Sequence, residues 1–241
     1  MTDSMLNRIA EKLAPCIKKR MEECKANYKW HLPEPRCDGC CSELKAINEF
    51  AKDKSREGKD AAQLIAFRQK FAEVWNSGVS QTIKERLATY VIADWGGIRS
   101  NSPKTIERYV RQSTDYKSLT KSMVGMASKS KILAAVDPVN CFVYDSWVCY
   151  GLNRFIENNI EKPDFYFPRI IGRNKKIKEY RVKSVRTKKR LCYQDYCDLI
   201  KRIAEMIQKE DELQLIEMTI FYMSRKGMFE DKCGAKGDCN E

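Results

Sequence analysis

Three side chains between residues 125 and 152 have types and spacing that suit catalysis. The stretch reads GMASKSKILAAVDPVNCFVYDSWVCYGL and places Lys129 and Lys131 ahead of Asp145. A lysine amine can attack a carbonyl carbon as a nucleophile, and a carboxylate can stabilise positive charge that develops beside it. The pattern therefore predicts a catalytic site, provided that the fold holds the lysine and the carboxylate at one place.

The residues around them predict two helix starts joined by an apolar link. Gly125 predicts a turn, followed by a helix that carries both lysines in its first turn and ends at Asp137-Pro138. The apolar residues 141–144 predict a strand-like link, and Asp145 follows as the N-cap of an amphipathic helix. Helix N-termini offer free N–H groups and partial positive charge, so they suit a backbone phosphate or a carboxylate. Taken alone, however, Asp145 is an ordinary N-cap and the lysines are ordinary surface residues.

The order of these features resembles the helix-hairpin-helix DNA glycosylase superfamily, and within it the oxoguanine-glycosylase-like proteins. The segment that carries the resemblance is SKILAAVDPVNCFVYDSWV, residues 130–148. The resemblance implies that Asp145 is the catalytic aspartate. It also implies that Lys131, or else Lys129, is the hairpin lysine that bifunctional members use as a nucleophile. Lys131 is preferred because two apolar residues follow it directly, as in the family.

The sequence departs from this family in two places. The LPGxG hairpin is represented only by Gly125 in KSMVGMASK, and the iron–sulfur cysteine cluster is absent. The helical pattern remains compatible with the family over residues 60–225. The resemblance thus implies a mostly α fold, a helical bundle of the helix-hairpin-helix glycosylase kind.

The implied chemistry is cleavage of an N-glycosidic bond. Cleavage develops positive charge on the sugar, which a neighbouring carboxylate stabilises, and a lysine amine can form a Schiff base with the sugar. No cofactor or metal is expected. The base must first be flipped out of the stack into a pocket lined with aromatic groups. Although these side chains would otherwise be assigned to the core, the candidates for that pocket are Trp95, Phe142, Tyr144, Trp147, Tyr193 and Tyr196.

The charge of the chain favours a polyanionic partner. The 241 residues include 45 Lys and Arg against 33 Asp and Glu, a formal net charge of +12. Eleven Lys or Arg residues fall between Arg169 and Arg190, with Glu179 as the one acid. Such a run is either a solvated face or a phosphate-binding element, and this density favours double-stranded DNA over a membrane surface. We expect a monomer whose DNA contacts include Gly125, Ser128, Ser130, Arg173, Lys175, Lys176, Lys188 and Lys189.

Apolar periodicity predicts helices along most of the chain, with a small basic β-hairpin around residues 165–190. We expect an N-terminal helical and loop extension over 1–59, the glycosylase-like domain over 60–225, and a loose tail over 226–241. The expected helices cover residues 4–26, 43–52, 60–76, 80–94, 104–111, 115–123, 130–136, those after 145, 192–209 and 211–225.

Other residue types exclude several classes of chemistry. The one histidine, His31, rules out most His-dependent catalysis, and no Gly-rich phosphate loop is present. The N-terminus has no apolar secretory segment, and no stretch is long enough to span a membrane. We therefore expect a cytoplasmic protein whose eleven cysteines are free thiols. A thiolate zinc site is the alternative, and its ligands would be Cys37, Cys40, Cys233 and Cys239.

The expected function is that of a DNA glycosylase that leaves an abasic site, either in repair or in defence against phage with modified DNA. Two alternatives remain open. The first is a non-catalytic DNA-binding protein that keeps the glycosylase fold. The second is a nucleic-acid-associated scaffold built around a cysteine zinc site.

Overall fold

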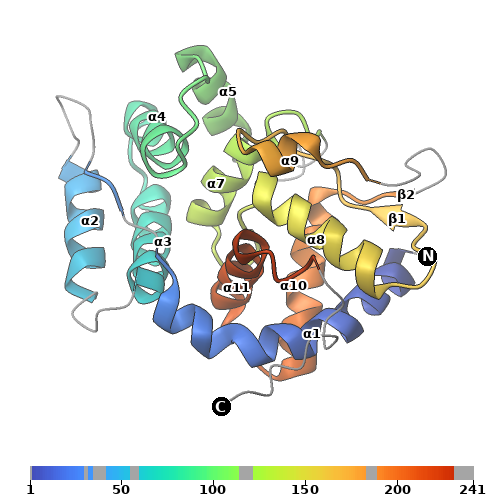
Figure 1. The fold of residues 1–241 in the computed structure, drawn as a ribbon. Coiled ribbons are helices and arrows are strands. Elements are labelled where there is room, and N and C mark those ends of the chain that lie inside the picture. Colours follow the sequence, from blue (N-terminus) through green and yellow to red (C-terminus); the bar gives the residue numbers. More distant parts are fainter. Residues whose placement is uncertain are drawn as a thin grey trace. The chain divides into compact units, whose positions relative to one another are not determined.

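A computed structural model of the chain describes residues 2–29, 32–34, 42–54, 60–113, 122–182 and 189–230. As the sequence predicts, these residues are mostly helical, and strands occur among them only as two very short segments (Figure 1). The chain forms two units, one made of residues 1–24 with 144–241 and the other of residues 25–143. The division between Val143 and Tyr144 falls inside the range in which the sequence predicts a single domain.

The first unit combines the N-terminal helix with the C-terminal half of the chain. Helix α1 carries an apolar stripe at a spacing of three or four residues, and each of its members from Leu6 to Met21 is buried. Pro15 lies inside this helix without ending it. The elements of the unit are α1 (Thr2–Asn27), α8 (Ser146–Asn159), β1 (Phe165–Tyr166), α9 (Lys175–Glu179), β2 (Lys189–Arg190), α10 (Tyr193–Ile207) and α11 (Leu213–Lys226).

Helix α8 packs against α11 at a point where the backbone approaches closely. A Cβ atom at Gly151 would lie 1.9 Å from Ser224 Oγ and 2.9 Å from a ring carbon of Phe229. Only glycine allows that approach. Helix α8, which begins directly after Asp145, is thereby fixed within the core of this unit.

The basic segment, which runs from Arg169 to Arg190, does not form the β-hairpin expected around residues 165–190. Strand β1 pairs with β2 in parallel, with Phe165 opposite Lys189 and Tyr166 opposite Arg190. A hairpin joins antiparallel strands, whereas parallel strands need a crossover connection. The connection here includes the short helix α9, so the prediction of a hairpin is wrong.

Among the described residues of the second unit, all regular secondary structure is helical. Its helices begin where the sequence supplies caps: Ser80 Oγ accepts from Ile83 N, and Ser102 Oγ accepts from Thr105 N. Helix α3 packs against both α2 and α7, and α4 packs against α5. The elements are α2 (Ser42–Lys54), α3 (Asp60–Asn76), α4 (Gln81–Thr89), η2 (Tyr90–Trp95), α5 (Pro103–Gln112) and α7 (Met126–Val136).

The helix expected over residues 80–94 changes type near its end. It is α-helical up to Thr89 and then continues as the π-helix η2, which ends at Trp95 before Gly96. Apolar spacing cannot distinguish the two helix types over so few residues. The helix expected over 115–123 lies largely outside the described residues.

Among the described helices, none combines the length and the apolar character that crossing a membrane requires.

Candidate active site

Lys131 is buried in the second unit, although a lone lysine normally lies on the surface. Its side chain is 4% exposed, and its Nζ donates to the carbonyl oxygen of Ala127 at 3.1 Å. The side chain passes over Gly96, where a Cβ atom would lie 2.3 Å from Lys131 Cδ and 2.4 Å from Cε. Gly96 is therefore the residue that makes room for this amine.

Lys129 lies two residues earlier on the same helix and is also buried, with 7% of its surface exposed. Its Nζ donates to the carbonyl oxygen of Ser122 at 3.1 Å and lies 5.8 Å from the centre of the Tyr109 ring. Burial, together with the positive charge of Arg108, lowers the pKa of the Lys129 amine. A lowered pKa increases the fraction of neutral amine, which is the nucleophilic form.

Helix α7 starts at Met126, so the lysines lie deeper in the helix than the sequence predicts. Its N-cap is Gly125, which has a φ of 72° and no room for a Cβ atom, because that atom would lie 2.1 Å from Tyr109 Oη. Lys131 lies beyond the first turn, but its amine reaches back to the carbonyl oxygen of Ala127 within that turn. Both lysine side chains are also buried.

The two serines predicted to contact DNA lie on the same helix. Ser128 accepts a hydrogen bond from Asn101 Nδ2 at 2.8 Å, and Ser130 has no exposed surface. Both side chains are thus turned into the unit, and Gly125 alone of the three predicted contacts on this turn is exposed.

The π-helix η2 packs against α7 and precedes Gly96 directly. Its last residue, Trp95, is 6% exposed and contacts both the Phe67 ring and the Arg68 guanidinium. Short π-helical segments occur frequently at functional sites. Gly96, on which Lys131 packs, follows this segment directly.

Asp145 lies in the first unit, where it caps α8 as the sequence predicts. Its Oδ1 accepts hydrogen bonds from Trp147 N at 2.8 Å and from Val148 N at 3.0 Å. One carboxylate oxygen is thus committed to the helix start, where negative charge is favoured. Residues 141–145 lead into this cap without regular secondary structure, so the predicted strand is absent from the link.

Tyr144, next to this cap, anchors an aromatic cluster. Its hydroxyl donates to the carbonyl oxygen of Pro168 at 2.7 Å, and burial raises its pKa well above the usual value. The rings of Tyr193 and Tyr196 lie 6.4 Å and 5.2 Å from the Tyr144 ring. These three rings are completely buried and form core packing in this structure.

The remaining predicted base-pocket residues are placed differently. Trp147 follows Asp145 in the first unit and is half-buried. Phe142 is fully buried and belongs, like Trp95, to the second unit. The six aromatic residues are therefore divided between the units, and three of the four in the first unit pack together.

The predicted basic contacts all lie in the first unit. Arg173 is exposed, and Lys175 Nζ lies 3.9 Å from Glu179 Oε1. Lys176 forms an ion pair with Glu230, and Lys189 lies on β2. Lys188 is outside the described residues. The positive charge of this segment is therefore neutralised by more than the single acid within it, Glu179. Glu230, which follows α11 in the sequence, also pairs with one of its lysines.

The cysteines in the described part of the chain are free thiols. Cys141, Cys149 and Cys197 are buried among apolar residues of the core. Burial raises the pKa of Cys149 to about 12, so it is not a nucleophile at neutral pH. The proposed zinc ligands and His31 lie outside the described residues, and within them no cluster of metal-binding side chains occurs.

Several residues around the lysines escape prediction from the sequence. Gly96 follows the helix expected over residues 80–94, and the sequence does not show that another side chain approaches it closely. Arg108, Tyr109 and Asn101 precede the motif by many residues, and nothing in their local sequence links them to it. Their proximity to Lys129 and Ser128 depends on the packing of the second unit.

No family model, curated protein or solved structure matches this chain.

Proposed function

We propose that this protein is a DNA glycosylase that flips a damaged or modified base out of double-stranded DNA and cleaves its N-glycosidic bond. Asp145 stabilises the positive charge that develops on the sugar. Lys131 is the nucleophile that forms a Schiff base in the lyase step, with Lys129 as the alternative. Asp145 belongs to the first unit, and Lys131 and Lys129 belong to the second.

The observation that carries this proposal is the burial of Lys131 against Gly96. Lysine is almost never buried without a functional or structural partner, since removing an ammonium group from water is costly. An amine held in a fixed position by its own helix and by a glycine suits the role of nucleophile, because little further ordering is needed before it reacts.

A second observation is the electrostatic environment of Lys129 on the same helix. The nearby Arg108 disfavours a protonated amine at this position, and burial does so more strongly. Enzymes that use a lysine as nucleophile employ these two effects to keep the amine reactive.

The basic segment supports DNA as the substrate. Arg173 and the lysines around it are exposed cations that can neutralise backbone phosphates without reading bases. Repair and phage defence both agree with this arrangement, because the difference between them lies in which base is excised.

The proposal is tested by incubating the protein with duplexes that each contain one damaged or modified base, including the modified bases of phage DNA. Alkali-labile strand breaks at the modified position are expected for at least one duplex. Tight binding to duplex DNA with no breaks in any member of the panel would contradict catalysis and support the alternative, a non-catalytic DNA-binding protein.

A further inference from the structure

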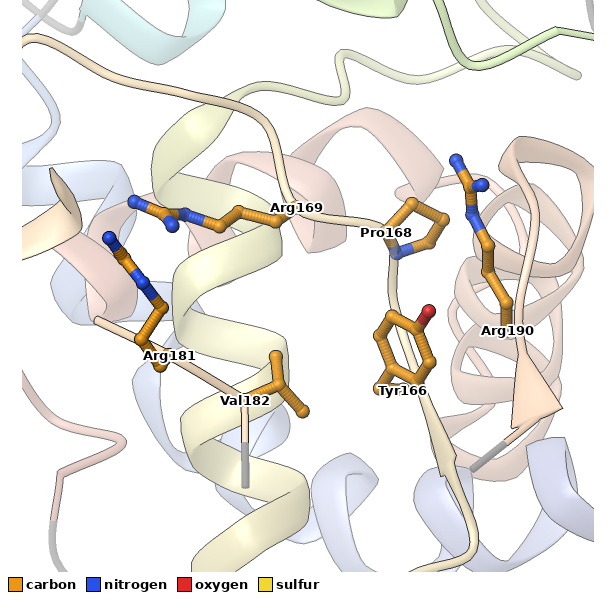
Figure 2. A pocket seen from close by; sticks show the side chains of 6 residues that line it. All are labelled: Tyr166, Pro168, Arg169, Arg181, Val182 and Arg190. Carbon is orange, nitrogen blue, oxygen red and sulfur yellow. The ribbon is translucent and has the colours of Figure 1, made fainter. Parts of the chain in front are cut away.

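The first unit contains a pocket of about 260 Å³ beside its small sheet. Figure 2 shows its side chains: Arg169 and Arg181 lie on one side, and Arg190 lies on the other. Tyr166 and Pro168 are between them. The lining residues are Tyr166, Pro168, Arg169, Arg181, Val182 and Arg190.

Two of these arginines are held together by one carbonyl oxygen. Arg169 Nη2 donates to the oxygen of Lys178 at 2.6 Å, and Arg181 Nη1 donates to the same oxygen at 2.5 Å. Arg169 Nη2 also donates to the oxygen of Ile177 at 2.8 Å. The two guanidinium groups are therefore positioned before any ligand arrives, with further N–H groups of each still available.

Their positive charge is not neutralised within the described part of the chain. There, no carboxylate oxygen lies within 4.0 Å of a guanidinium nitrogen of Arg169, Arg181 or Arg190. Other cations of the same segment differ, since Lys176 is paired with Glu230. Clustered guanidinium groups without a carboxylate are a preferred binding arrangement for phosphate.

Beside the arginines, the pocket is lined by Tyr166, Pro168 and Val182. Tyr166 lies opposite Arg190 in the parallel pair β1–β2, so both side chains stand on one face of the sheet. Pro168 is fixed by the hydrogen bond that its carbonyl oxygen accepts from Tyr144. The aromatic ring of Tyr166 next to these cations suits a ligand that has both a phosphate and a planar base, because bases stack on aromatic side chains.

We propose that this pocket binds one nucleotide of an unpaired DNA strand. Its phosphate lies between Arg169 and Arg181, and its base lies against Tyr166 and Pro168. The pocket volume of about 260 Å³ lies just below the range of about 300–1,000 Å³ that is typical of small-molecule pockets, which favours a single small unit over a base pair. The choice of DNA among phosphate ligands rests on the proposed function, since a glycosylase unpairs the strand on which it acts.

The test uses the full-length protein and a fluorescein-labelled oligothymidylate of about eight nucleotides. Binding is measured by fluorescence anisotropy for the wild type, Arg181→Gln and Tyr166→Leu. Arg225→Gln is the matched control, because it removes the same charge from an exposed position on α11. Circular dichroism verifies that every variant is folded.

The Kd is expected to rise at least about tenfold for Arg181→Gln, which loses charge-assisted hydrogen bonds. It should rise about fivefold or more for Tyr166→Leu, which loses a stacking surface. Arg225→Gln should change it by less than about twofold. Thymidine 5′-monophosphate should displace the oligonucleotide at a lower concentration than inorganic phosphate does.

Equal losses of oligonucleotide affinity for Arg181→Gln and Arg225→Gln would contradict nucleotide binding in this pocket. Equal displacement of the oligonucleotide by thymidine 5′-monophosphate and by inorganic phosphate would contradict it as well. These outcomes are separable from the proposed function, which is measured by base release. If base release occurs while the pocket variants bind like the wild type, only the pocket is overturned. If the pocket variants lose binding while no base is ever released, the pocket is supported and the glycosylase proposal fails.

Discussion

The side chain of Lys131 lies directly on Gly96, so closely that a Cβ atom there would be 2.3 Å from Lys131 Cδ. The same Cβ atom would lie 2.7 Å from the carbonyl oxygen of Val91 in the π-helix, which cannot move aside as a side chain can. The position of the Lys131 amine therefore depends on the absence of a side chain at residue 96.

Replacing Gly96 with alanine should displace the amine and lower the rate of Schiff-base formation. A displacement of about 1 Å can reduce a rate by roughly one hundredfold, and the crowding should cost about 1–3 kcal/mol of stability. The control is Gly97→Ala, since Gly97 has a φ of 67° but no atom near its Cβ position. It should lose comparable stability with a much smaller loss of rate, measured by single-turnover kinetics and denaturant unfolding. Similar rate losses for both variants would contradict the role given to Gly96.

Borohydride should trap a covalent adduct between the protein and a cleavable duplex. Lys131→Ala should abolish the adduct, because the attacking amine is gone, and Lys129→Ala should reduce it less. The adduct is measured as a shifted band on a denaturing gel. Loss of the adduct in Lys129→Ala alone would assign the nucleophile to Lys129. Base release without any adduct would mean that water attacks the sugar.

The stability of the protein should depend on pH through Lys129. Its pKa is lowered in the folded state by burial and by Arg108, whereas the unfolded chain has the ordinary value of 10.5. Between these two pKa values the unfolded state binds more protons, so the free energy of unfolding rises with pH. Lys129→Met removes this contribution. Denaturant unfolding from neutral pH to 10.5 should therefore show a smaller rise for Lys129→Met than for the wild type.

The control for this experiment is Lys45→Met, because Lys45 is an exposed lysine on α2 in the same unit. Its pH dependence should parallel that of the wild type. Parallel curves for Lys129→Met and the wild type would contradict the burial effect at Lys129.

The basic segment should bind phosphates without reading sequence. Each phosphate neutralised contributes close to one unit to the slope of log affinity against log salt on duplex DNA. Removing four charges should flatten the slope by up to about 3–4 units, with similar losses of affinity on every sequence. The four substitutions to glutamine are at Lys175, Lys176, Lys188 and Lys189.

The matched control removes four exposed charges elsewhere. An unchanged slope in the segment variant, or an equal change in the control, would show that the run is only a solvated face. The control substitutions to glutamine are at Lys12, Lys18, Lys19 and Lys45.

Most of the helices could be predicted from the sequence, because the apolar spacing and the caps are local signals. Asp145 marks the start of α8, as predicted, and α5 begins at Pro103, one residue before the helix expected over 104–111. The parallel pairing of Tyr166 with Arg190 could not be predicted, because it joins residues far apart in the chain. The weak alternation of apolar and polar residues between Tyr166 and Arg190 is as compatible with a hairpin as with a parallel pair.

The candidate site was predictable only in part. The order of Lys131 and Asp145 in the motif is visible in the sequence, but the burial of Lys131 is not. Taken alone, a lysine on a short helix is expected to be exposed, and its real environment depends on Gly96 and on a π-helix that apolar spacing does not reveal. The arginine pocket depends in the same way on the carbonyl oxygen of Lys178, which no residue type encodes.

In the proposed mechanism the Asp145 carboxylate stabilises the transition state of base release. Asparagine caps helices as well as aspartate does, so Asp145→Asn should keep α8 and DNA binding intact. The control is Asp195→Asn, because Asp195 Oδ2 also accepts a backbone N–H near a helix start, from Cys192 at 2.6 Å. It removes the same charge from the same unit.

The decisive measurement is the single-turnover rate of base release for these two variants on the best duplex of the panel. Asp145→Asn should lower the rate at least about a hundredfold, because a charge aimed at the transition state is lost. Asp195→Asn should stay within a few-fold of the wild type. Full activity in Asp145→Asn, with Kd for the duplex unchanged, would contradict the account.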